Sequence, residues 1–249
     1  SQLLFKTQKH SPIEAELPSH QLLLRAGLIR RVATGIYSLT PLAYRALSSI
    51  EDIVREEMKG IGAQELLLPV VQPADLWEAS GRLSAHDATL ARFTDRTDHP
   101  LILAMNSAEV VVDLVGSMVD SYRQLPLLVY QIQTRFSDEA RPRGGLIRSR
   151  ESRVKDAYSF HASPQSLKET HMTISRTYER IFARLSLPVQ VVQAATEPVG
   201  GTAAHQFMFT SDRGDETLIV CPACGYAANQ DVATAKKEIS TRNNNQRDP

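Results

Sequence analysis

The sequence predicts an α+β fold in which helices flank a largely antiparallel sheet. Short apolar strands alternate irregularly with amphipathic helices, without the regular βαβ order that builds a parallel sheet. The 249 residues are enough to bury a substantial core. Residues 127–160 predict two long strands joined by a turn with proline and paired glycines, as expected of an antiparallel pair.

The N-terminal part predicts a short helix, two short strands and a long helix. The short helix is expected over residues 19–26, and the strands lie on either side of a turn at Gly35. Thr40 and Pro41 begin the long helix, because threonine is a favoured N-cap and proline suits the first helical position. Apolar side chains recur at helical spacing as far as Gly60, where we expect this helix to end.

Residues 64–71 predict one compact apolar strand. Pro69 places that strand at a sheet edge or an interface, because proline cannot donate a ladder hydrogen bond. A short helix follows over residues 73–80 and carries the only tryptophan, Trp77, which we expect to pack rather than to bind a ligand. The polar residues 81–100 predict a hairpin or loop near the surface.

The rest of the chain alternates strands with amphipathic helices. A strand over residues 101–105 leads into a helix over residues 107–122, whose apolar side chains share one face. Ser163 and Pro164 begin another helix, which we expect to reach Leu185. The remaining predicted strands cover residues 188–194, 206–210 and 217–220.

The central hairpin carries an unusual concentration of charge. Its strands are expected over residues 127–136 and 146–160, with the turn at 141–145 between them. The turn and its flanks contain four arginines and three carboxylates, namely Arg141, Arg143, Arg148, Arg150, Asp138, Glu139 and Glu151. Two interpretations stay open: a solvated hairpin with salt bridges, or a platform that binds phosphate or carboxylate groups in bidentate geometry.

Composition excludes several classes of protein. Basic and acidic residues both number 28, so no global positive charge favours nucleic acid, and any such site must be local. No apolar run is long enough to span a membrane, and the first residues lack a signal-peptide pattern, so we expect a cytoplasmic protein. Cys221 and Cys224 are the only cysteines and could form half of a zinc site, but no second ligand pair is evident, so we predict no metal.

Five segments, in this order, resemble the class II aminoacyl-tRNA synthetases, and among them the bacterial-type prolyl-tRNA synthetases. The N-terminal segment of that family is similar to LLLRAGLIRRVATGIYSLTPLAYRAL. Its motif 1 is similar to EDIVREEMKGIGAQELLLPVVQPADLWEASGR, and its motif 2 to SYRQLPLLVYQIQTRFSDEARPRGGLIRSRESRVKDAYSF. The segments that follow motif 2 are similar to GGTAAHQFM and CPACGYAAN.

The resemblance implies a fold, an assembly and a reaction. The fold is an antiparallel sheet flanked by helices, and the assembly is a homodimer with Pro69 at the interface. In the reaction, ATP activates proline to an adenylate, and the proline then passes to tRNA. The implied catalytic-domain core covers residues 1–235, with motifs 1 and 2, before a polar tail over residues 236–249. No segment resembles motif 3, the anticodon-binding domain or the editing insertion, so we expect no tRNA binding by this chain alone.

The motif 2 segment departs from the family at two positions that contact ATP. Ser137 stands where the family has an arginine for the α-phosphate, and Ser152 where it has the phenylalanine that stacks on adenine. Losing one such contact to a developing charge typically lowers the rate by ~10²–10³. Glu139, Arg148 and Arg150 keep the family's residue types, so ATP and Mg are expected only if this degenerate site still functions.

Other positions also bear on the site. Gly144 replaces a phenylalanine of the loop, and we expect Arg135 to reach the site only through a change of strand register. The resemblance assigns the amino-acid pocket to Ser107, Glu109, His205 and Gln206. Glu109 could meet a secondary amine, whereas Gln206 lacks the charge of the family's glutamate. The hydroxyl of Ser107 could instead cap the following helix, and the sequence leaves both roles open.

Three hypotheses of function follow. The first, which we favour, is a prolyl-tRNA synthetase-like protein without full adenylation activity and with no assigned catalytic residue. It would act as a regulatory or accessory subunit of a protein partner and bind proline or a related ligand. The second is a divergent enzyme that activates an amino acid with ATP and loads something other than tRNA. The third is a fragment of an active proline–tRNA ligase, which leaves Ser137 and Ser152 unexplained.

Overall fold

The computed structural model describes residues 2–13, 15–85, 89–196, 201 and 203–235. Contacts between α-carbons divide the chain into two compact units, Ser1–Ser186 and Leu187–Pro249. The predicted core boundary at residue 235 stays a prediction, and the predicted tail over residues 236–249 lies outside the described residues. Across the described ranges, no helix combines the length and the apolar character needed to cross a membrane.

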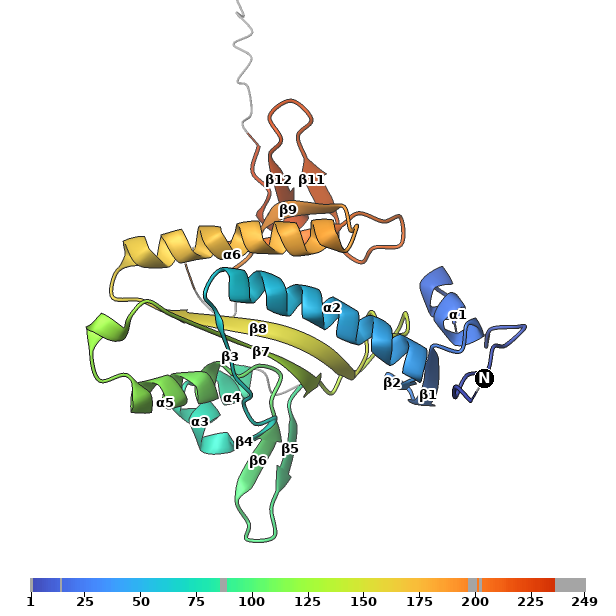
Figure 1. Ribbon diagram of the computed structural model, residues 1–249, viewed down its shortest axis with the longest axis horizontal. Helices are drawn as coiled ribbons and strands as arrows, with labels where there is room; N and C mark the ends of the chain where they lie inside the picture. The colour runs from blue at the N-terminus through green and yellow to red at the C-terminus, as the bar shows by residue number, and fades with distance from the viewer. Residues whose placement is uncertain (1, 14, 86–88, 197–200, 202, 236–249) are drawn as a thin grey trace, which may run out of the picture. The chain divides into compact units, whose positions relative to one another are not determined.

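The first unit is built on a small sheet with helices on both faces. Its elements are β3 (Gln64–Glu65), β7 (Leu127–Phe136), β8 (Glu151–Phe160), α2 (Pro41–Gly60), α5 (Ala108–Met118) and α6 (Pro164–Arg184). β7 and β8 pair antiparallel along their full length, and β3 adds to the other edge of β7 in parallel. α2 and α6 lie on one face of this sheet and α5 on the other (Figure 1). This is the predicted α+β architecture.

Alternation along β7 explains the two layers. Tyr130 and Ile132 are buried against Met58 of α2, together with half-buried Tyr178 of α6. Val129 points to the other face, where it packs with apolar side chains of α5. Because successive strand residues point to opposite faces, one strand supplies both cores.

The long helices confirm most of the predicted boundaries. α6 begins at Pro164, and the hydroxyl of Ser163 accepts a hydrogen bond from the backbone N–H of Ser166, as predicted for a cap. α2 begins at Pro41, but the side chain of Thr40 makes no capping hydrogen bond, so that detail is wrong. Gly60 is still helical, because Gly62, with φ of 76°, takes the left-handed conformation that ends the helix.

The prediction of one strand over residues 64–71 is wrong. Only β3 joins the central sheet, whereas β4 (Val71–Pro73) belongs to another sheet of order β4-β6-β5. The N–H of Leu68 donates to the side chain of Gln131, and its carbonyl accepts from the side chain of Gln133. Side chains therefore satisfy the backbone at the point where a strand would have continued.

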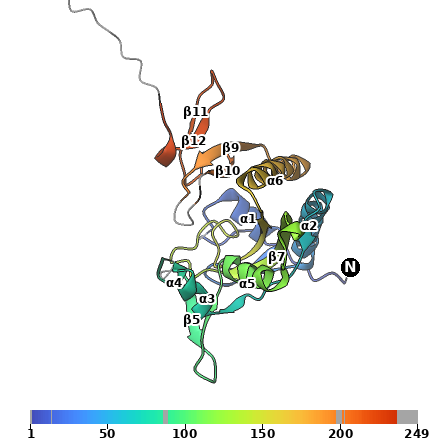
Figure 2. The same ribbon diagram turned by 90° about the vertical axis from the view of Figure 1, so that its left-hand side faces the viewer.

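Two strands of the second sheet form a hairpin, in agreement with the hairpin or loop predicted for residues 81–100. It contains β5 (Ala91–Thr94) and β6 (Pro100–Leu103), beside the short helices α3 (Ala74–Ala79) and α4 (Arg82–Ala85). The tip of this hairpin projects from the unit, as Figure 2 shows. Trp77 is fully buried in a cluster that includes Ile102, and its indole N–H donates to Gln72 at 2.9 Å. The prediction that Trp77 packs in the core is confirmed.

The N-terminal elements contact the loop that joins β7 to β8. They are α1 (Pro18–Arg25), β1 (Ile29–Ala33) and β2 (Ile36–Leu39). The carbonyl of Gly35, in the β1–β2 turn, accepts a hydrogen bond from the N–H of Arg150 at 2.8 Å. β8 begins only at Glu151, because Arg148 forms a bridge with Arg143 inside the loop and residues 146–150 are not part of the strand.

The second unit is a four-stranded sheet of order β10-β9-β12-β11. Its strands are β9 (Val189–Ala194), β10 (Ala204–Phe209), β11 (Leu218–Val220) and β12 (Ala227–Asn229). The sequence predicts the first three, and β10 pairs with β9 over six residues. It does not predict β12, since alanines carry little β-propensity. Two short 3₁₀ helices, Tyr122–Gln124 and Gln230–Val232, complete the described elements of the chain.

Candidate functional site

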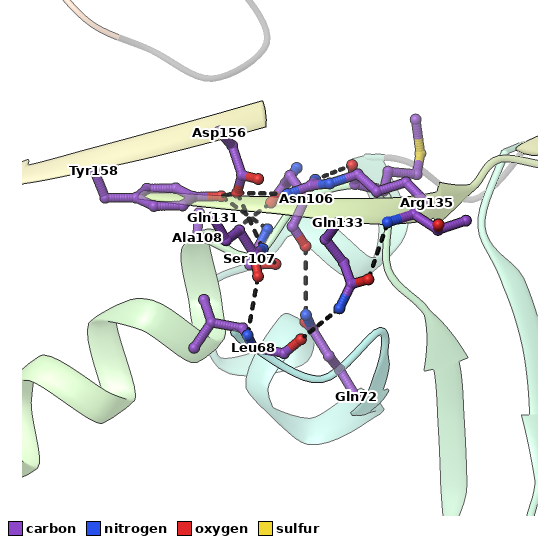
Figure 3. Close-up of polar contacts among 12 residues, drawn as sticks. Leu68, Gln72, Asn106, Ser107, Ala108, Gln131, Gln133, Arg135, Asp156 and Tyr158 are labelled. Carbon is purple, nitrogen blue, oxygen red and sulfur yellow. Dashed lines mark hydrogen bonds and ion pairs between the residues drawn. The ribbon is translucent and has the colours of Figure 1, made fainter. Parts of the chain in front are cut away.

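A buried polar network covers one face of the β7–β8 pair (Figure 3). The amide of Gln131, on β7, donates to the hydroxyl of Ser107 at 2.8 Å and accepts from the backbone of Leu68 at 2.9 Å. The hydroxyl of Tyr158, on β8, accepts from the backbone N–H of Ser107 at 2.9 Å and donates to Asp156 at 2.5 Å. These bonds fix the start of α5 against the sheet.

Tyr158 stays protonated in this network. Burial raises the pKa of its phenol to about 12, and the hydrogen bond to Asp156 adds to the effect. The proton on the phenol is the one donated to the carboxylate of Asp156. Tyr158 is therefore a positioning group for Ser107 rather than an acid or base.

Arg135 lies on the same face of β7 as Gln131, so the prediction that it needs a register change is wrong. Residues separated by an even number of positions share a face of a strand. Its Nη2 is 2.5 Å from Oδ2 of Asp156, and its Nη1 donates to the carbonyl of Met105. Arg135 is only 6% exposed. The Arg135 guanidinium is engaged by Asp156 and by the carbonyl of Met105, so it does not replace an arginine at position 137.

Ser107 does not cap α5 with its side chain. It occupies the N-cap position, but its hydroxyl accepts from Gln131 and makes no capping hydrogen bond. Ser107 is also buried, at 4% exposure. The capping alternative is excluded, because the hydroxyl is engaged with the sheet.

Glu109 is a buried carboxylate whose two oxygens differ in their hydrogen bonding. Its side chain is 3% exposed, and Oε1 lies 2.8 Å from Nη1 of Arg82 and 3.1 Å from the hydroxyl of Ser80. Its Oε2 is buried and accepts no hydrogen bond from the described residues. Position in the first turn of α5 also favours a negative charge, because the helix dipole is positive there. One oxygen is thus held in place and the other keeps its accepting capacity.

Sequence reasoning missed Arg82. This residue begins α4, contacts Oδ1 of Asn106 at 3.4 Å, and places its guanidinium 5.4 Å from the ring centroid of Trp77. No local spacing connects positions 82 and 109, so only the fold brings the two charges together. Asp156 and Tyr158 were also missed, although their two-residue spacing on a predicted strand indicates a shared face.

The retained motif 2 charges form a compact arrangement in the loop after β7. Nε and Nη2 of Arg148 contact the two carboxylate oxygens of Glu139 at 2.8 and 3.2 Å. The N–H of Arg141 also donates to Glu139, and Nε of Arg150 donates to its carbonyl at 3.0 Å. Arg148 is the main cause that lowers the pKa of Glu139. Salt bridges and hydrogen bonds within the loop therefore hold Glu139, Arg148 and Arg150. This agrees with the interpretation of a solvated hairpin with salt bridges.

The two serines of motif 2 lie at either side of this loop. The backbone N–H of Ser137 donates to the carbonyl of Arg150 at 2.8 Å, so its backbone continues the pairing of β7 with β8. Ser152 is exposed and lies opposite Arg135 in the strand register. Neither side chain supplies a cation or an aromatic ring.

His205 and Gln206 belong to the second unit, and they differ in exposure. Gln206 lines a cavity of about 450 Å³ whose walls include Asp215, Glu216 and Asp231. Its Oε1 is buried and accepts no hydrogen bond from the described residues. His205, the preceding residue on β10, is exposed. The relation of these two residues to Ser107 and Glu109 stays a prediction.

Two further predicted features concern metal binding and assembly. Among the described residues, no group of three or more His, Cys, Asp or Glu is arranged so that it could hold a metal ion. Pro69 lies exposed between β3 and β4, and its neighbours Leu67 and Val71 are 74% and 43% exposed. We call these three exposed apolar residues the Pro69 strip, and they include the position where the resemblance places a dimer interface.

A sheet of β3, β7 and β8 between α2, α6 and α5, with the Glu109 and motif 2 groups beside it, defines a class II aminoacyl-tRNA synthetase core. The chain belongs to the family described as the tRNA synthetase class II core domain (G, H, P, S and T), whose model matches residues 91–244. A proline–tRNA ligase of Dehalococcoides mccartyi is 47% identical over 238 residues, or 96% of this chain. The enzyme of strain CBDB1 is 46% identical over 238 residues, again 96% of this chain.

Solved structures show the same fold. Prolyl-tRNA synthetase from Giardia lamblia, in complex with prolyl-adenylate, matches 67% of this chain and 35% of its own, with 22% identity and a TM-score of 0.63. The enzyme from Cryptosporidium parvum, complexed with L-proline and AMP, matches 80% of this chain and 41% of its own, with 19% identity and a TM-score of 0.68. The chain spans 42% of the length of the curated relatives it matches. The predicted resemblance and fold class are confirmed.

Proposed function

We propose that the first unit binds proline or a related secondary amine, and that the chain forms the adenylate poorly by itself. The observation that carries the proposal is the buried Oε2 of Glu109, whose partner oxygen is held by Arg82 and Ser80. A secondary ammonium group could donate to this oxygen and match its charge. A buried carboxylate oxygen without a hydrogen bond is otherwise costly, by about 1–3 kcal/mol.

The groups around Glu109 support a pocket of fixed shape. Ser107 is held by both strands of the central pair, through Gln131 and Tyr158. Asn106 is held by Arg82 and by the N–H of Ala108. Sites whose side chains are already hydrogen-bonded lose little entropy on binding, which favours recognition of a small ligand.

The residues at the expected ATP-binding positions of motif 2 support the proposal that the chain forms the adenylate poorly. Ser137 and Ser152 lack the charge and the ring that the family uses, and Arg135 is engaged with Asp156. We therefore propose a regulatory or accessory role, in which ligand binding is communicated to a protein partner or to a second copy that packs on the Pro69 strip. ATP and Mg enter this proposal only as weak ligands of the motif 2 loop.

A second candidate function is a fragment of an active proline–tRNA ligase. Identity of 47% over 96% of the chain favours it, as does the chain's coverage of 42% of that relative. In this case the remainder of the enzyme would supply further contacts to ATP. The relatives are named proline–tRNA ligases, so the reaction and the substrates would be those of the whole enzyme.

Calorimetric titration with proline tests the first candidate. We expect saturable binding of proline and markedly weaker binding of alanine, which offers a primary amine. Glu109→Gln should weaken proline binding at least about tenfold, because a charge-assisted hydrogen bond contributes about 1.5–3 kcal/mol. Asp113→Asn is the matched control, since it removes an exposed carboxylate from the same helix and leaves Glu109 unchanged. Equal titration curves for proline and alanine would contradict the proposal.

Proline-dependent exchange between ATP and pyrophosphate separates the two candidates. The chain is fused to the remaining C-terminal part of the Dehalococcoides relative, and the exchange rate is compared with that of the intact relative. A fragment of an active ligase should give a fusion with near-native exchange. A degenerate site should give a fusion about 10²-fold slower or worse, because its motif 2 still lacks the arginine at position 137.

A further inference from the structure

The turn that joins β11 to β12 holds two thiols that the proposed function does not use. Cys221 directly follows β11, and Cys224 lies three residues later. The N–H of Cys221 donates to the carbonyl of Tyr226 at 2.8 Å, and its carbonyl accepts from Gly225 at 2.9 Å. Gly225 has φ of 72°, which glycine adopts readily. These bonds fold residues 221–226 into a closed turn.

The closed turn places the two cysteines within one turn of the backbone. The bond from the N–H of Gly225 to the carbonyl of Cys221 closes a five-residue turn that contains both cysteines, and residues three apart in a tight turn have α-carbons within about 7 Å. Disulfides form at α-carbon separations of about 4.4–6.8 Å, so the spacing is compatible with a bond. Cys224 is exposed and Cys221 is half-buried, so a small reagent can reach the pair.

The turn also distinguishes the two thiols chemically. The sulfur of Cys221 accepts hydrogen bonds from the backbone N–H groups of Cys224 and Ala223. Together with the Cys224 thiol, these donors lower the pKa of Cys221. The thiolate is the reactive form of cysteine, so Cys221 is the better nucleophile and Cys224 the natural second thiol.

A metal is a poorer explanation of this turn. A structural zinc ion takes four ligands in almost every protein site. Within the part of the chain that the structure describes, no third His, Cys, Asp or Glu joins the two cysteines in a possible metal group. Two adjacent thiols are, however, sufficient for thiol–disulfide exchange.

We propose that Cys221 and Cys224 form a reversible dithiol–disulfide site whose substrates are small-molecule disulfides such as glutathione disulfide. The thiolate of Cys221 attacks one sulfur, the disulfide bond breaks, and one glutathione leaves as a thiolate. Cys224 then releases its proton to solvent and attacks the Cys221 sulfur of the mixed disulfide, which expels the second glutathione. The protein loses two electrons, and glutathione disulfide is reduced to two glutathione molecules.

The test uses the full chain, in which these are the only two cysteines. The protein is equilibrated with mixtures of reduced and oxidised glutathione, quenched with acid, alkylated with N-ethylmaleimide and weighed as an intact chain. We expect two species, one doubly alkylated and one unalkylated and lighter by two hydrogens, whose ratio follows the glutathione ratio reversibly. A chain that stays doubly alkylated, or that accumulates only glutathione adducts, overturns the proposal.

Two variants assign the roles of the thiols. Cys224→Ser should accumulate glutathione on Cys221, because no second thiol expels it. Cys221→Ser should react with glutathione disulfide roughly tenfold more slowly, since Cys224 lacks the two backbone donors. Equal rates for the two variants, or stoichiometric zinc in the isolated protein that protects both thiols from alkylation, would overturn the assignment. Circular dichroism verifies that both variants keep the fold of the parent chain.

Discussion

Arg135 and Asp156 form a buried ion pair across the two central strands, with 2.5 Å between Nη2 and Oδ2. Their side chains are 7% and 16% exposed. Both charges have been taken out of water, so each depends on the other for compensation. The pair also anchors Tyr158, which in turn holds the backbone of Ser107. An interaction on the sheet thus fixes the start of the helix that carries Glu109.

Asp156→Asn should destabilise the first unit strongly. Removing one partner of a buried ion pair leaves an uncompensated charge, which typically costs about 3–5 kcal/mol. Urea unfolding followed by far-ultraviolet circular dichroism measures this loss. The double variant Asp156→Asn with Arg135→Gln should recover much of it, because both charges are then gone. A single variant within about 1 kcal/mol of the parent would show that Arg135 is compensated by other groups.

Gly35→Ala should destabilise the protein more than Gly62→Ala. Both glycines have positive φ, 75° and 76°, so both substitutions carry a similar backbone penalty of about 1 kcal/mol. A β-carbon on Gly35 would also lie 2.7 Å from Cβ of Pro142, whereas one on Gly62 would meet nothing within 4 Å. The difference in unfolding free energy between the two variants therefore reports how tightly the β1–β2 turn packs on the motif 2 loop. Equal losses would mean that this loop moves aside freely.

Stability should rise with pH between about 8 and 10 because of Lys155. Its amino group donates to the hydroxyl of Tyr178 and lies 4.3 Å from the ring centroid. Burial lowers the pKa of Lys155 to about 8, although the charge of Asp156 opposes the shift. The unfolded chain holds this proton up to about pH 10.4, so within the window it binds more protons than the folded state. Stability therefore increases across the window, by on the order of 2–3 kcal/mol.

Lys155→Met should remove this rise and increase stability at neutral pH. Urea unfolding at neutral pH and near pH 9.5 measures both effects. Lys168→Met is the control, because it removes an exposed lysine from α6 by the same substitution. The window stays below pH 10 because the pKa of Tyr178 is raised, and its ionisation in the unfolded chain works in the opposite direction. A parallel pH profile for Lys155→Met and the parent would contradict the assignment.

Local patterns predicted the elements whose side chains follow a clear period. The alternation along residues 127–136 gave β7 with its apolar face, and serine before proline gave the start of α6. The break in the strand over residues 64–71 could not be predicted, because it depends on side chains of Gln131 and Gln133 that are distant in sequence. The end of α2 could not be predicted either, because it depends on Gly62, rather than Gly60, adopting a positive φ.

The candidate site was predictable only where family motifs are continuous in sequence. The resemblance assigned Ser107, Glu109, Glu139 and Arg148 to the site in this way, and their roles there stay predictions. The partner that fixes Glu109 is Arg82, which comes from α4 and has no spacing signal. Arg135 was expected to reach the site only through a change of register, yet it shares a face with Gln131, because residues an even number of positions apart on a strand point the same way. Tertiary contacts, rather than residue types, therefore decide which charged side chains remain available to contact a ligand.

The double variant Ser137→Arg with Ser152→Phe should restore ATP binding. An arginine at position 137 would add a charge-assisted contact to phosphate, which contributes about 1.5–3 kcal/mol. A phenylalanine at position 152 would add stacking on adenine, worth about 1–3 kcal/mol. Ser152 is exposed and Ser137 half-buried, so both positions have room for larger side chains. Calorimetry with ATP should show affinity at least about tenfold higher than that of the parent.

The control for this gain is Ile147→Arg, because Ile147 is 70% exposed and lies in the same loop. It adds one positive charge to the motif 2 loop without the geometry of position 137. If general charge were responsible, Ile147→Arg would raise ATP affinity as much as the double variant, and salt would abolish both gains. If position matters, only the double variant gains affinity, and the same two substitutions in the fusion with the C-terminal part should raise exchange by ~10²-fold. No gain in either setting would mean that the missing contacts are not what limits this site.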